Sequence, residues 1–397
     1  MREELALFGG TPVTREIFPQ WPRLAEASIS DALETLRSGR LSYWSGLKGR
    51  EFESKWASWI GCRQAVSCSS GTLALHLALA GLGIGGGDEV IVPSHSFIAS
   101  ASCVSLAGAT PVFCDVAEDH TLDPRRIAPL VTARTRAIVI VHLYGIVCDM
   151  GRILETARAR GLAVIEDCAQ CAGGEYRGAK TGVLGDAGCF SFHESKHVTT
   201  GGEGGMVVTD NEDLAWECRS LRDYGADVRE WYRADADARE PAAHVRPGFN
   251  CRLAEAQSAI GIAELARLDS WNLPRRRGYA KTYDHAFSQL YGVRGLPLDT
   301  PERRNAYWRY PLQFDPEKLA CSGEELRRAL AAEGIPAGGA QWREAYEEPL
   351  FAGKGRCATA EALRDRTLAL YLHPTWERSH IELCIAGVKK VLRAYRR

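Results

Sequence analysis

Seven short apolar runs, several rich in β-branched residues, recur between residues 64 and 210, and stretches with helical spacing separate them. A strand buried on both faces reads as a continuous apolar run, and regular alternation of such strands with helices is typical of a parallel sheet. The sequence therefore predicts a doubly wound α/β domain around a mainly parallel, seven-stranded sheet. The runs are AVSC near residue 65, EVIVP near 90, TPVFCDV near 112, AIVIVHLYG near 140, LAVIED near 164, GCFSF near 190 and GMVVTD near 206.

The segments between these runs have the signals of helices. Residues 71–82, 97–108 and 149–160 carry apolar side chains at helical spacing. The segment 211–225 begins with acidic residues and ends at a glycine, as the polarity of a helix favours. These segments are predicted to cover the two faces of the sheet.

The pattern changes after the last run, which predicts a second and smaller domain. Residues 225–249 are polar and charged and contain proline, which indicates a long loop or a seam between domains. We therefore predict an N-terminal arm and a large α/β domain over residues 1–245, and a small C-terminal α+β domain over residues 246–397.

Two helices are predicted in this second part. The segment from Arg252 to Leu290 has the pattern of one long helix that stops or kinks at Pro274. Ser322 and Glu325, three residues apart, match the capping box that opens a helix.

Charge and hydropathy exclude some classes of partner. Lys and Arg number 49 against 50 Asp and Glu, so the formal net charge of -1 gives no overall basic field for nucleic acid or for an anionic membrane. The chain has no run of eighteen apolar residues, and its N-terminus lacks a basic start before an apolar core. We therefore expect neither a membrane span nor export, and the cytoplasm is the expected location.

The thirteen cysteines have irregular spacings, which favours reduced, buried side chains over a disulfide framework. Cys168 and Cys171 form a CxxC pair, but no second pair of Cys or His follows at the spacing of metal ligands. We therefore predict no metal site and no redox role for this pair.

The first apolar run leads into a helical pattern through Ser70, Gly71 and Thr72. Free N–H groups and the helix dipole favour a phosphate at a helix N-terminus, and glycine lets the backbone come close to it. The same residues could instead only cap the helix. This segment is a candidate phosphate cradle.

Two further strand ends carry ionisable side chains. LAVIED ends near Asp167, and Lys196 follows GCFSF at five residues from Ser191. Sheets of this kind place ligands at the carboxyl ends of parallel strands. Asp167 alone could be a cap or half of an ion pair, whereas a buried lysine costs free energy unless it is paired, neutralised or used covalently.

The phosphate cradle, the strand-end aspartate and the strand-end lysine together are the groups that hold pyridoxal phosphate. The lysine amine forms a Schiff base with the aldehyde, the aspartate keeps the pyridine nitrogen protonated, and the helix N-terminus binds the phosphate. We therefore predict a pyridoxal phosphate enzyme with Lys196 and Asp167 as its catalytic residues.

Nearly the whole chain resembles the DegT/DnrJ/EryC1/StrS family of pyridoxal phosphate enzymes, most of which are sugar aminotransferases of the fold type I class. This resemblance implies a large doubly wound domain with a smaller C-terminal domain. The motifs that carry it, in the order of the family, are LSYWSGLKGREFESKWASWIGC, SSGTLALHLAL, GDEVIVPSHSFIASASCVSLAGATPVFCDV, VHLYG, EDCAQCAGGEYRGAKTG, FSFHESKHVTTGGEGGMVVTD and GFNCRLAEAQSAIGIAEL.

The resemblance implies a role for each residue of the site. Lys196 is the Schiff-base lysine, Asp167 the partner of the pyridine nitrogen, and Gln170 a contact of the phenolic oxygen. Phe97 stacks on the pyridine ring, and Asn250 reaches the phosphate from the neighbouring subunit, which implies a homodimer with shared active sites. The phosphate contacts within one chain are Ser70, Gly71, Thr72 and Ser191.

The expected reaction is transfer of an amino group from glutamate or glutamine to a nucleotide-linked keto-sugar, in amino-sugar, antibiotic or polysaccharide biosynthesis. An alternative acceptor is a ketocyclitol of the inosose type, because LALFGGTPV and FPQWP resemble the opening of such members. A more remote alternative is a regulator that binds the cofactor without turnover. Lys196 argues against the dehydratase members of the family, which have His at this position.

Other candidates receive no catalytic role. His193 and His197 flank the lysine, and we expect them to pack or to contact substrate, because Lys196 itself can move the proton. In the C-terminal part, Arg309, Arg343 and His373 are candidates to line a substrate pocket.

Overall fold

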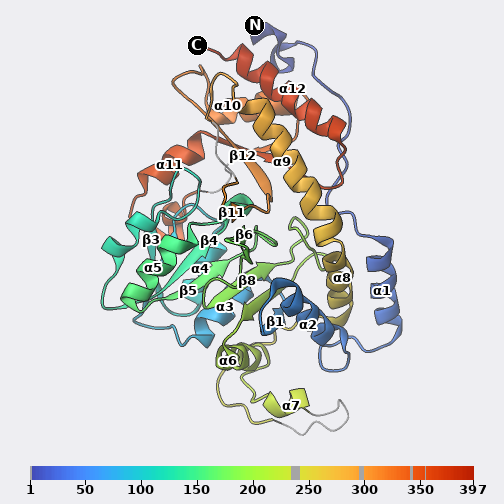
Figure 1. Cartoon of the computed structure of the whole chain (residues 1–397), viewed down its shortest axis with the longest axis vertical. Helices are drawn as coiled ribbons and strands as arrows, with labels where there is room; N and C mark the ends of the chain where they lie inside the picture. Colours follow the sequence, from blue (N-terminus) through green and yellow to red (C-terminus); the bar gives the residue numbers. More distant parts are fainter. Residues whose placement is uncertain (1, 234–241, 295–298, 340–342, 354) are drawn as a thin grey trace.

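A seven-stranded sheet lies at the centre of the chain, in the order β1-β9-β8-β5-β4-β2-β3 (Figure 1). The computed structural model describes residues 2–233, 242–294, 299–339, 343–353 and 355–397. The strands coincide with the seven predicted runs, so the predicted sheet is confirmed. They are β1 Gln64–Cys68, β2 Glu89–Pro93, β3 Thr110–Cys114, β4 Thr135–Val141, β5 Ala163–Asp167, β8 Ala187–Ser191 and β9 Gly205–Thr209.

The strand directions bring most of the carboxyl ends to one edge of this sheet. β3, β2, β4, β5 and β8 are parallel neighbours, whereas β9 is antiparallel to both β8 and β1. β1 therefore runs in the same direction as β8. We call the edge where these strands end the C-terminal edge, and it is the edge where such sheets bind ligands.

Helices cover both faces of the sheet. Alternate residues of one strand enter different cores: Val139 packs with α3, α4 and α6, whereas Ile138 and Ile140 pack with α2 and α5. This alternation explains why each strand is apolar throughout. The four helices predicted between strands are present as α3 Gly71–Gly81, α4 Ala99–Leu106, α5 Met150–Arg160 and α6 Glu212–Arg222.

Three helices of distant sequence origin form a layer beside the sheet. α1 (Glu26–Arg37) and α2 (Lys48–Ile60) both pack against α8 (Glu255–Ala266). The Glu255 carboxylate accepts hydrogen bonds from the backbone N–H groups of Lys48 and Gly49, at 2.6 and 2.8 Å, and so caps α2. The start of the predicted small domain is thus tied to the N-terminal part of the chain.

The long helical segment is interrupted where proline predicts it. α8 is followed by a π-helical turn, Leu268–Asn272, and then by α9, Leu273–Phe287. Pro274 lies in the first turn of α9, where its missing N–H costs no hydrogen bond. The predicted break in the helix is confirmed.

A second sheet lies beyond α9. Its strands are antiparallel, in the order β10-β12-β14-β13, and α9, α10 (Gly323–Ala332) and α12 (Arg378–Ala394) lie beside it (Figure 1). The predicted capping box is present, because Ser322 Oγ accepts from Glu325 N at 3.2 Å and Glu325 Oε2 from Ser322 N at 2.8 Å. The strands are β10 Val293–Arg294, β12 Arg309–Phe314, β13 Ala337–Gly339 and β14 Thr367–Tyr371.

The rest of the chain links these two sheets. β11 (Arg303–Arg304) pairs with β6 (Glu175–Tyr176), which pairs with β7 (Ala179–Lys180). After β13 the chain returns to the large sheet, where the Asp115 carboxylate caps α11 (Ala358–Asp365) through the N–H groups of Thr359 and Ala360. The domain boundary between residues 245 and 246 stays a prediction.

The predicted loop over residues 225–249 is wrong in part. A short helix, α7 (Arg229–Arg233), lies within it, and residues 234–241 lie outside the described residues. Tyr232 of α7 accepts a hydrogen bond from Arg222 at 2.6 Å and contacts Tyr43. These aromatic contacts give the short helix a packed face that its polar sequence does not indicate.

The first residues form a strap that crosses the molecule, which we call the N-terminal strap (residues 5–22). Glu333 accepts hydrogen bonds from the N–H groups of Ala6 and Val13, both at 2.9 Å. The Trp376 indole donates to the carbonyl of Pro19 at 3.0 Å, and the Trp21 indole donates to the carbonyl of Lys196 at 3.2 Å. Among the helices described, none is both long and apolar enough to cross a membrane.

Candidate active site

The N-terminus of α3 lies directly against the end of β8. A Cβ atom built on Gly71 would lie 2.7 Å from the Cβ of Ser191, so only glycine allows this approach. Ser70 caps α3, because its Oγ accepts a hydrogen bond from Leu73 N at 3.2 Å. The structure therefore brings together Ser70, Gly71, Thr72 and Ser191. The free N–H groups of a first helical turn and the hydroxyls beside them suit a phosphate.

Asp167 ends β5 and is buried between β4 and β8. Its Oδ2 accepts a hydrogen bond from Ser100 Oγ at 2.7 Å, and its Oδ1 accepts one from Ala169 N at 3.0 Å. Burial raises the pKa of this carboxyl group, against the opposing effects of these hydrogen bonds and of the charge of Lys196. A cation placed beside Asp167 would stabilise the ionised form.

Lys196 lies after β8 at the same edge, partly exposed. Its Nζ is 4.4 Å from the ring centroid of Trp308, and no carboxylate of the described residues lies within ion-pair distance. Burial lowers the pKa of Lys196 to about 8; Asp167 acts against this, and the charge of Arg309 adds to it. A lysine with this pKa is a usable nucleophile and proton carrier near neutral pH.

Gln170 lies beside these residues in the loop after β5. It is buried, and its Oε1 accepts a hydrogen bond from Tyr144 N at 2.8 Å. The bond fixes the amide against the loop that follows β4. Its expected contact with the phenolic oxygen of the cofactor stays a prediction.

Phe97 and Asn250 are both on the surface of the chain. The Phe97 side chain is 51% exposed. Asn250 is exposed and forms an isolated bridge with Asp223, while the next carbonyl, that of Cys251, accepts from Ser69 N at 2.8 Å. Their predicted roles, stacking on the cofactor and contact across a dimer, are not tested by a single chain.

The two histidines beside the lysine have structural partners. His197 is buried and its Nε2 donates to the carbonyl of Ala306 at 3.1 Å. Burial lowers its pKa well below the ordinary value. His193 Nδ1 accepts from Ser195 N at 3.1 Å, which closes the turn before Lys196. The packing expected for His197 is confirmed.

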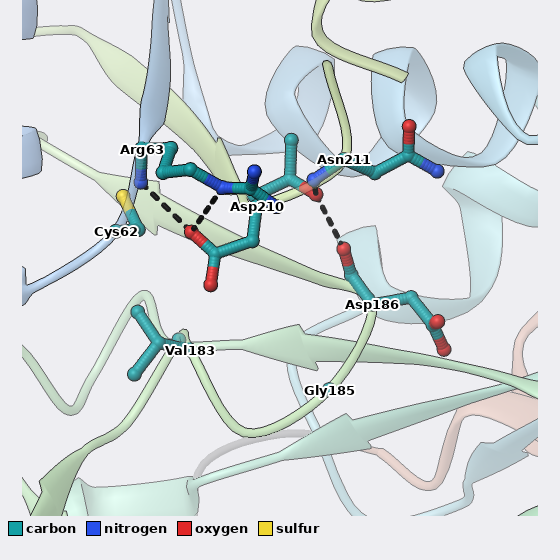
Figure 2. Close-up of a pocket in the computed structure, with 9 residues that line it drawn as sticks. Cys62, Arg63, Val183, Gly185, Asp186, Asp210 and Asn211 are labelled. Carbon is teal, nitrogen blue, oxygen red and sulfur yellow. Dashed lines mark hydrogen bonds and ion pairs between the residues drawn. The ribbon is translucent and has the colours of Figure 1, made fainter. Parts of the chain in front are cut away.

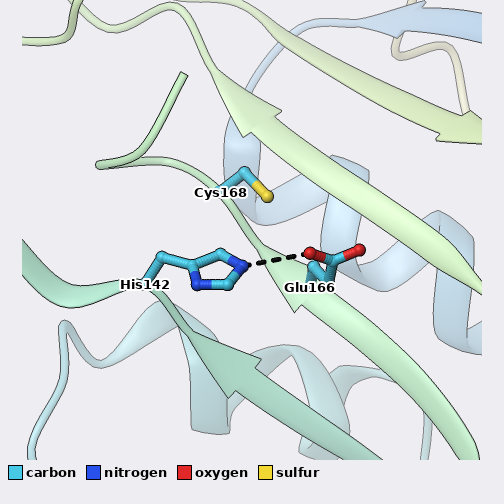
Figure 3. Close-up of side chains that lie close together, drawn as sticks. All are labelled: His142, Glu166 and Cys168. Atoms are coloured by element: carbon cyan, nitrogen blue, oxygen red, sulfur yellow. Dashed lines mark hydrogen bonds and ion pairs between the residues drawn. The ribbon is translucent and has the colours of Figure 1, made fainter. Parts of the chain in front are cut away.

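A buried cluster of His142, Glu166 and Cys168 lies next to Asp167 (Figure 3). The ligand atoms lie within 4.8 Å of one another, as in a metal site. Yet His142 Nδ1 accepts from Cys148 N at 3.1 Å, and its Nε2 donates to Glu166 at 3.0 Å. The Glu166 carboxylate also accepts N–H groups of Gly182, Leu184 and Gly185, so it holds the 182–185 loop.

A cavity of about 280 Å³ lies at the opposite edge of the sheet (Figure 2). Asp186, Asp210 and Arg63 line it, where β8 begins and β9 ends. The Asp210 carboxylate accepts from Arg63 N at 2.8 Å. The cavity therefore lies one strand length away from Ser191 and belongs to no part of the predicted site.

Sequence reasoning missed three residues of the site. Ser100 binds Asp167, Trp308 covers the amine of Lys196 and Trp21 binds its carbonyl. Ser100 lies three residues after Phe97, so helical spacing could have drawn attention to it. Trp308 and Trp21 come from distant segments, and no local pattern indicates their place.

These groups fit pyridoxal phosphate. Gly71 approaches Ser191 closely, so the N-terminus of α3 forms a cradle that no side chain of residue 71 fills, which we call the α3 cradle. Asp167 is a buried carboxylate. Lys196 is an amine without an acidic partner among the described residues. Together they supply a place for a phosphate, a counter-charge for a pyridine nitrogen and an amine for an aldehyde.

Known proteins resemble the chain over most of its length. A GDP-perosamine synthase of Caulobacter vibrioides is 42% identical over 298 residues, which are 74% of this chain and 76% of that protein. A dTDP-3-amino-3,4,6-trideoxy-alpha-D-glucose transaminase of Streptomyces venezuelae is 38% identical over 370 residues, 92% of this chain and 91% of that protein.

Solved structures agree with these relatives. An aminotransferase of Psychrobacter cryohalolentis has a TM-score of 0.89 and 33% identity, and the match covers 95% of this chain and 99% of that one. A putative sugar aminotransferase of Streptococcus pneumoniae, solved in its PLP form, has a TM-score of 0.85 and 25% identity over 95% and 99% of the two chains. The predicted fold type and the cofactor, pyridoxal phosphate, are confirmed.

The model of the DegT/DnrJ/EryC1/StrS aminotransferase family matches residues 22–389. This range includes both sheets, α3 with its cradle, Asp167 and Lys196. The chain is a member of the DegT/DnrJ/EryC1/StrS family and a pyridoxal phosphate-dependent aminotransferase.

Proposed function

We propose that this aminotransferase takes an amino group from glutamate or glutamine and transfers it to the keto group of a nucleotide-linked sugar. The observation that carries the proposal is the meeting of Lys196, Asp167 and the α3 cradle at one edge of the sheet, in a chain of this family. The product is an amino sugar still attached to its nucleotide.

The names of the relatives favour a nucleotide-linked sugar over a ketocyclitol. A further relative, a UDP-N-acetyl-3-dehydro-alpha-D-glucosamine 3-aminotransferase of Acidithiobacillus ferrooxidans, is 37% identical over 354 residues. Like the two relatives above, it is named for a sugar linked to a nucleoside diphosphate. A family of aminotransferases also speaks against a regulator without turnover.

The residues of the site would have separate roles in this reaction. Bound pyridoxal phosphate supplies an aldehyde that captures the amino group of the donor, and a ring that withdraws electrons from the donor's α-carbon. Lys196, with its pKa near 8, would accept the proton from that carbon and return it to the acceptor. Asp167, held by Ser100, would keep the pyridine nitrogen protonated, and the α3 cradle would anchor the phosphate.

We also propose that the active form is a homodimer with shared sites. Phe249, the residue directly before Asn250, is 45% exposed. Exposed aromatic side chains of this kind are enriched where proteins associate. Asn250 of one chain would then contact the phosphate bound by the other.

Three experiments test these proposals. Replacing Lys196 with Ala should abolish turnover while cofactor binding through the α3 cradle persists, and full activity of the variant would refute the proposed role. Mixing this inactive variant with an inactive Asn250→Ala variant should restore activity, because a mixed dimer contains one complete site. If the mixture stays inactive, the shared site is wrong. A panel of keto-sugars with and without their nucleotide tests the acceptor.

A further inference from the structure

Arg309 lies close to the reactive lysine without being part of the predicted cofactor site. It is the first residue of β12, opposite Tyr371 of β14. Its guanidinium carbon is 4.4 Å from the ring centroid of Trp308 and 4.6 Å from that of Tyr371. Lys196 Nζ lies 4.4 Å from the same Trp308 ring. The Trp308 indole therefore contacts both cations.

Among the described residues, Arg309 has no acidic partner. Within the described ranges no carboxylate lies within 4.0 Å of its guanidinium, and its Nε is buried without a hydrogen-bond partner. Its interaction with the two rings supplies only part of the stabilisation that a desolvated cation needs. The buried Arg222, by contrast, pairs with Glu53 at 2.7 Å.

A second arginine adds positive charge on the same side. Arg276 of α9 is buried; its Nη1 donates to the carbonyl of Trp308 at 3.1 Å, and its Nη2 is buried without a partner. His373 lies near both arginines, and its Nδ1 is also unpartnered. Burial lowers the pKa of His373 to about 3, and the charges of Arg276 and Arg309 add to this, so the imidazole is neutral.

The side chains around Trp308 therefore include three cations that form no ion pair with a carboxylate of the described residues. A positively charged region with unused N–H donors selects an anionic ligand, and the planar guanidinium matches a carboxylate or a phosphate. The cofactor's own phosphate is already provided for at Ser191 and α3, where a helix N-terminus supplies the donors.

We propose that Arg309 binds the α-carboxylate of the amino donor. This inference rests on the proposed function and names the residue that selects an α-amino acid as donor. An amino acid carries its α-carboxylate on the carbon that loses the proton to Lys196, so the carboxylate must lie near the lysine amine. In a nucleotide-linked sugar the diphosphate is several bonds away from the reacting carbon, whereas in an amino acid the α-carboxylate is bonded directly to it.

The test compares Arg309→Met with a matched control, Arg304→Met. The control removes a guanidinium from the same segment, where Arg304 is 58% exposed and pairs with Glu175 at 3.0 Å, a surface pair of little energetic weight. Circular dichroism and thermal unfolding establish that both variants fold. The cofactor is bound in each protein before the measurement.

The first readout is binding without turnover. The 2-methyl derivatives of glutamate and glutamine have an α-carboxylate but no proton on the reacting carbon, and their binding is followed by the absorbance of the cofactor. We expect Arg309→Met to bind them about ten- to a hundredfold more weakly than the parent and Arg304→Met to bind them unchanged, as loss of a charge-assisted hydrogen bond predicts.

The second readout removes the carboxylate from the ligand instead of the arginine from the protein. 4-Aminobutyrate is glutamate without its α-carboxylate, so the parent should convert it far more slowly than glutamate, and Arg309→Met should lose this difference. Equal binding of the 2-methyl derivatives by parent and Arg309→Met would overturn the proposal. So would weaker binding of UDP, dTDP or GDP with donor binding unchanged, which would assign Arg309 to the diphosphate.

Failure of the proposed function gives a different result. If the parent binds the 2-methyl derivatives through Arg309 but neither glutamate nor glutamine yields an aminated sugar from any keto-sugar, the acceptor or the reaction is wrong and the carboxylate site stands. If the parent does not bind these derivatives, the carboxylate site is wrong, whatever the acceptor.

Discussion

Lys196 should combine with pyridoxal phosphate at a pH where an ordinary lysine is almost unreactive. Only the neutral amine attacks an aldehyde, and burial, with a smaller effect of Arg309, lowers the pKa of Lys196 from 10.5 to about 8. At pH 7 the neutral fraction is then about 9%, against about 0.03% for an unperturbed lysine. The structure therefore predicts an advantage of about 300-fold in the fraction of neutral, reactive amine.

The assay is the rate of cofactor recombination with the cofactor-free protein between pH 6 and 10, followed by absorbance. Each rate is divided by that of an Nα-acetylated lysine ester under the same conditions, so that titration of the cofactor cancels. The ratio should be highest below pH 8, where both amines are mainly protonated. It should fall toward pH 10.5, because Lys196 is then already neutral while the reference amine still gains neutral form. Replacing Arg309 with Met should raise the pKa of Lys196. A protein rate that climbs without levelling until pH 10 refutes the reasoning.

Three further predictions concern residues that support the site or the fold. Ser100→Ala removes a donor from Asp167, whose pKa burial already raises, so the acid limb of the activity profile should move to higher pH; an unmoved limb contradicts the role of Ser100. Gly71→Ala should weaken cofactor binding and lower the free energy of unfolding by about 1–3 kcal/mol through overlap with Ser191. Adding Ser191→Gly should restore part of the lost stability but not the cofactor binding, and unchanged stability of Gly71→Ala would contradict the overlap. Glu53→Gln should destabilise the chain by about 3 kcal/mol in urea unfolding, because the buried Arg222 loses one of the two acidic partners it has among the described residues and keeps Asp223. A change below about 1 kcal/mol speaks against this.

The elements of the fold were predictable where a local pattern determines them. The runs that became β4 and β5 are apolar on both faces because helices cover both, and this shows directly in the sequence. Pro274 and the Ser322 capping box act within one or two turns of their own helices. The helix α7 was missed because its five residues are too few to show the apolar periodicity of a helix. Its packing also depends on Tyr43, which lies far away in the chain.

The site was predictable for residues at strand and helix ends, and not for those that surround them. Asp167, Lys196 and Gly71 follow recognisable elements, so topology alone brings them to one edge. Ser100 lies 67 residues from Asp167, and Trp308 comes from the segment before β12, so only the folded chain shows these contacts. Arg309 and Arg343 were equivalent candidates in the sequence, but Arg343 is exposed whereas Arg309 lies against the lysine-covering indole.

The N-terminal strap can be anchored only late in the synthesis of the residues described here. The strap is translated before its anchors, because Glu333 follows Ala6 by 327 residues and Trp376 follows Pro19 by 357. All seven strands of the large sheet exist once residue 209 has been made, and so do Lys196 and Asp167. Trp21 donates to the carbonyl of Lys196, but the neighbouring Pro19 gains its own anchor only once Trp376 has been made. A nascent chain therefore carries Lys196 and Asp167 before the strap is anchored, and a chain truncated before residue 376 would lack one of the strap's anchors.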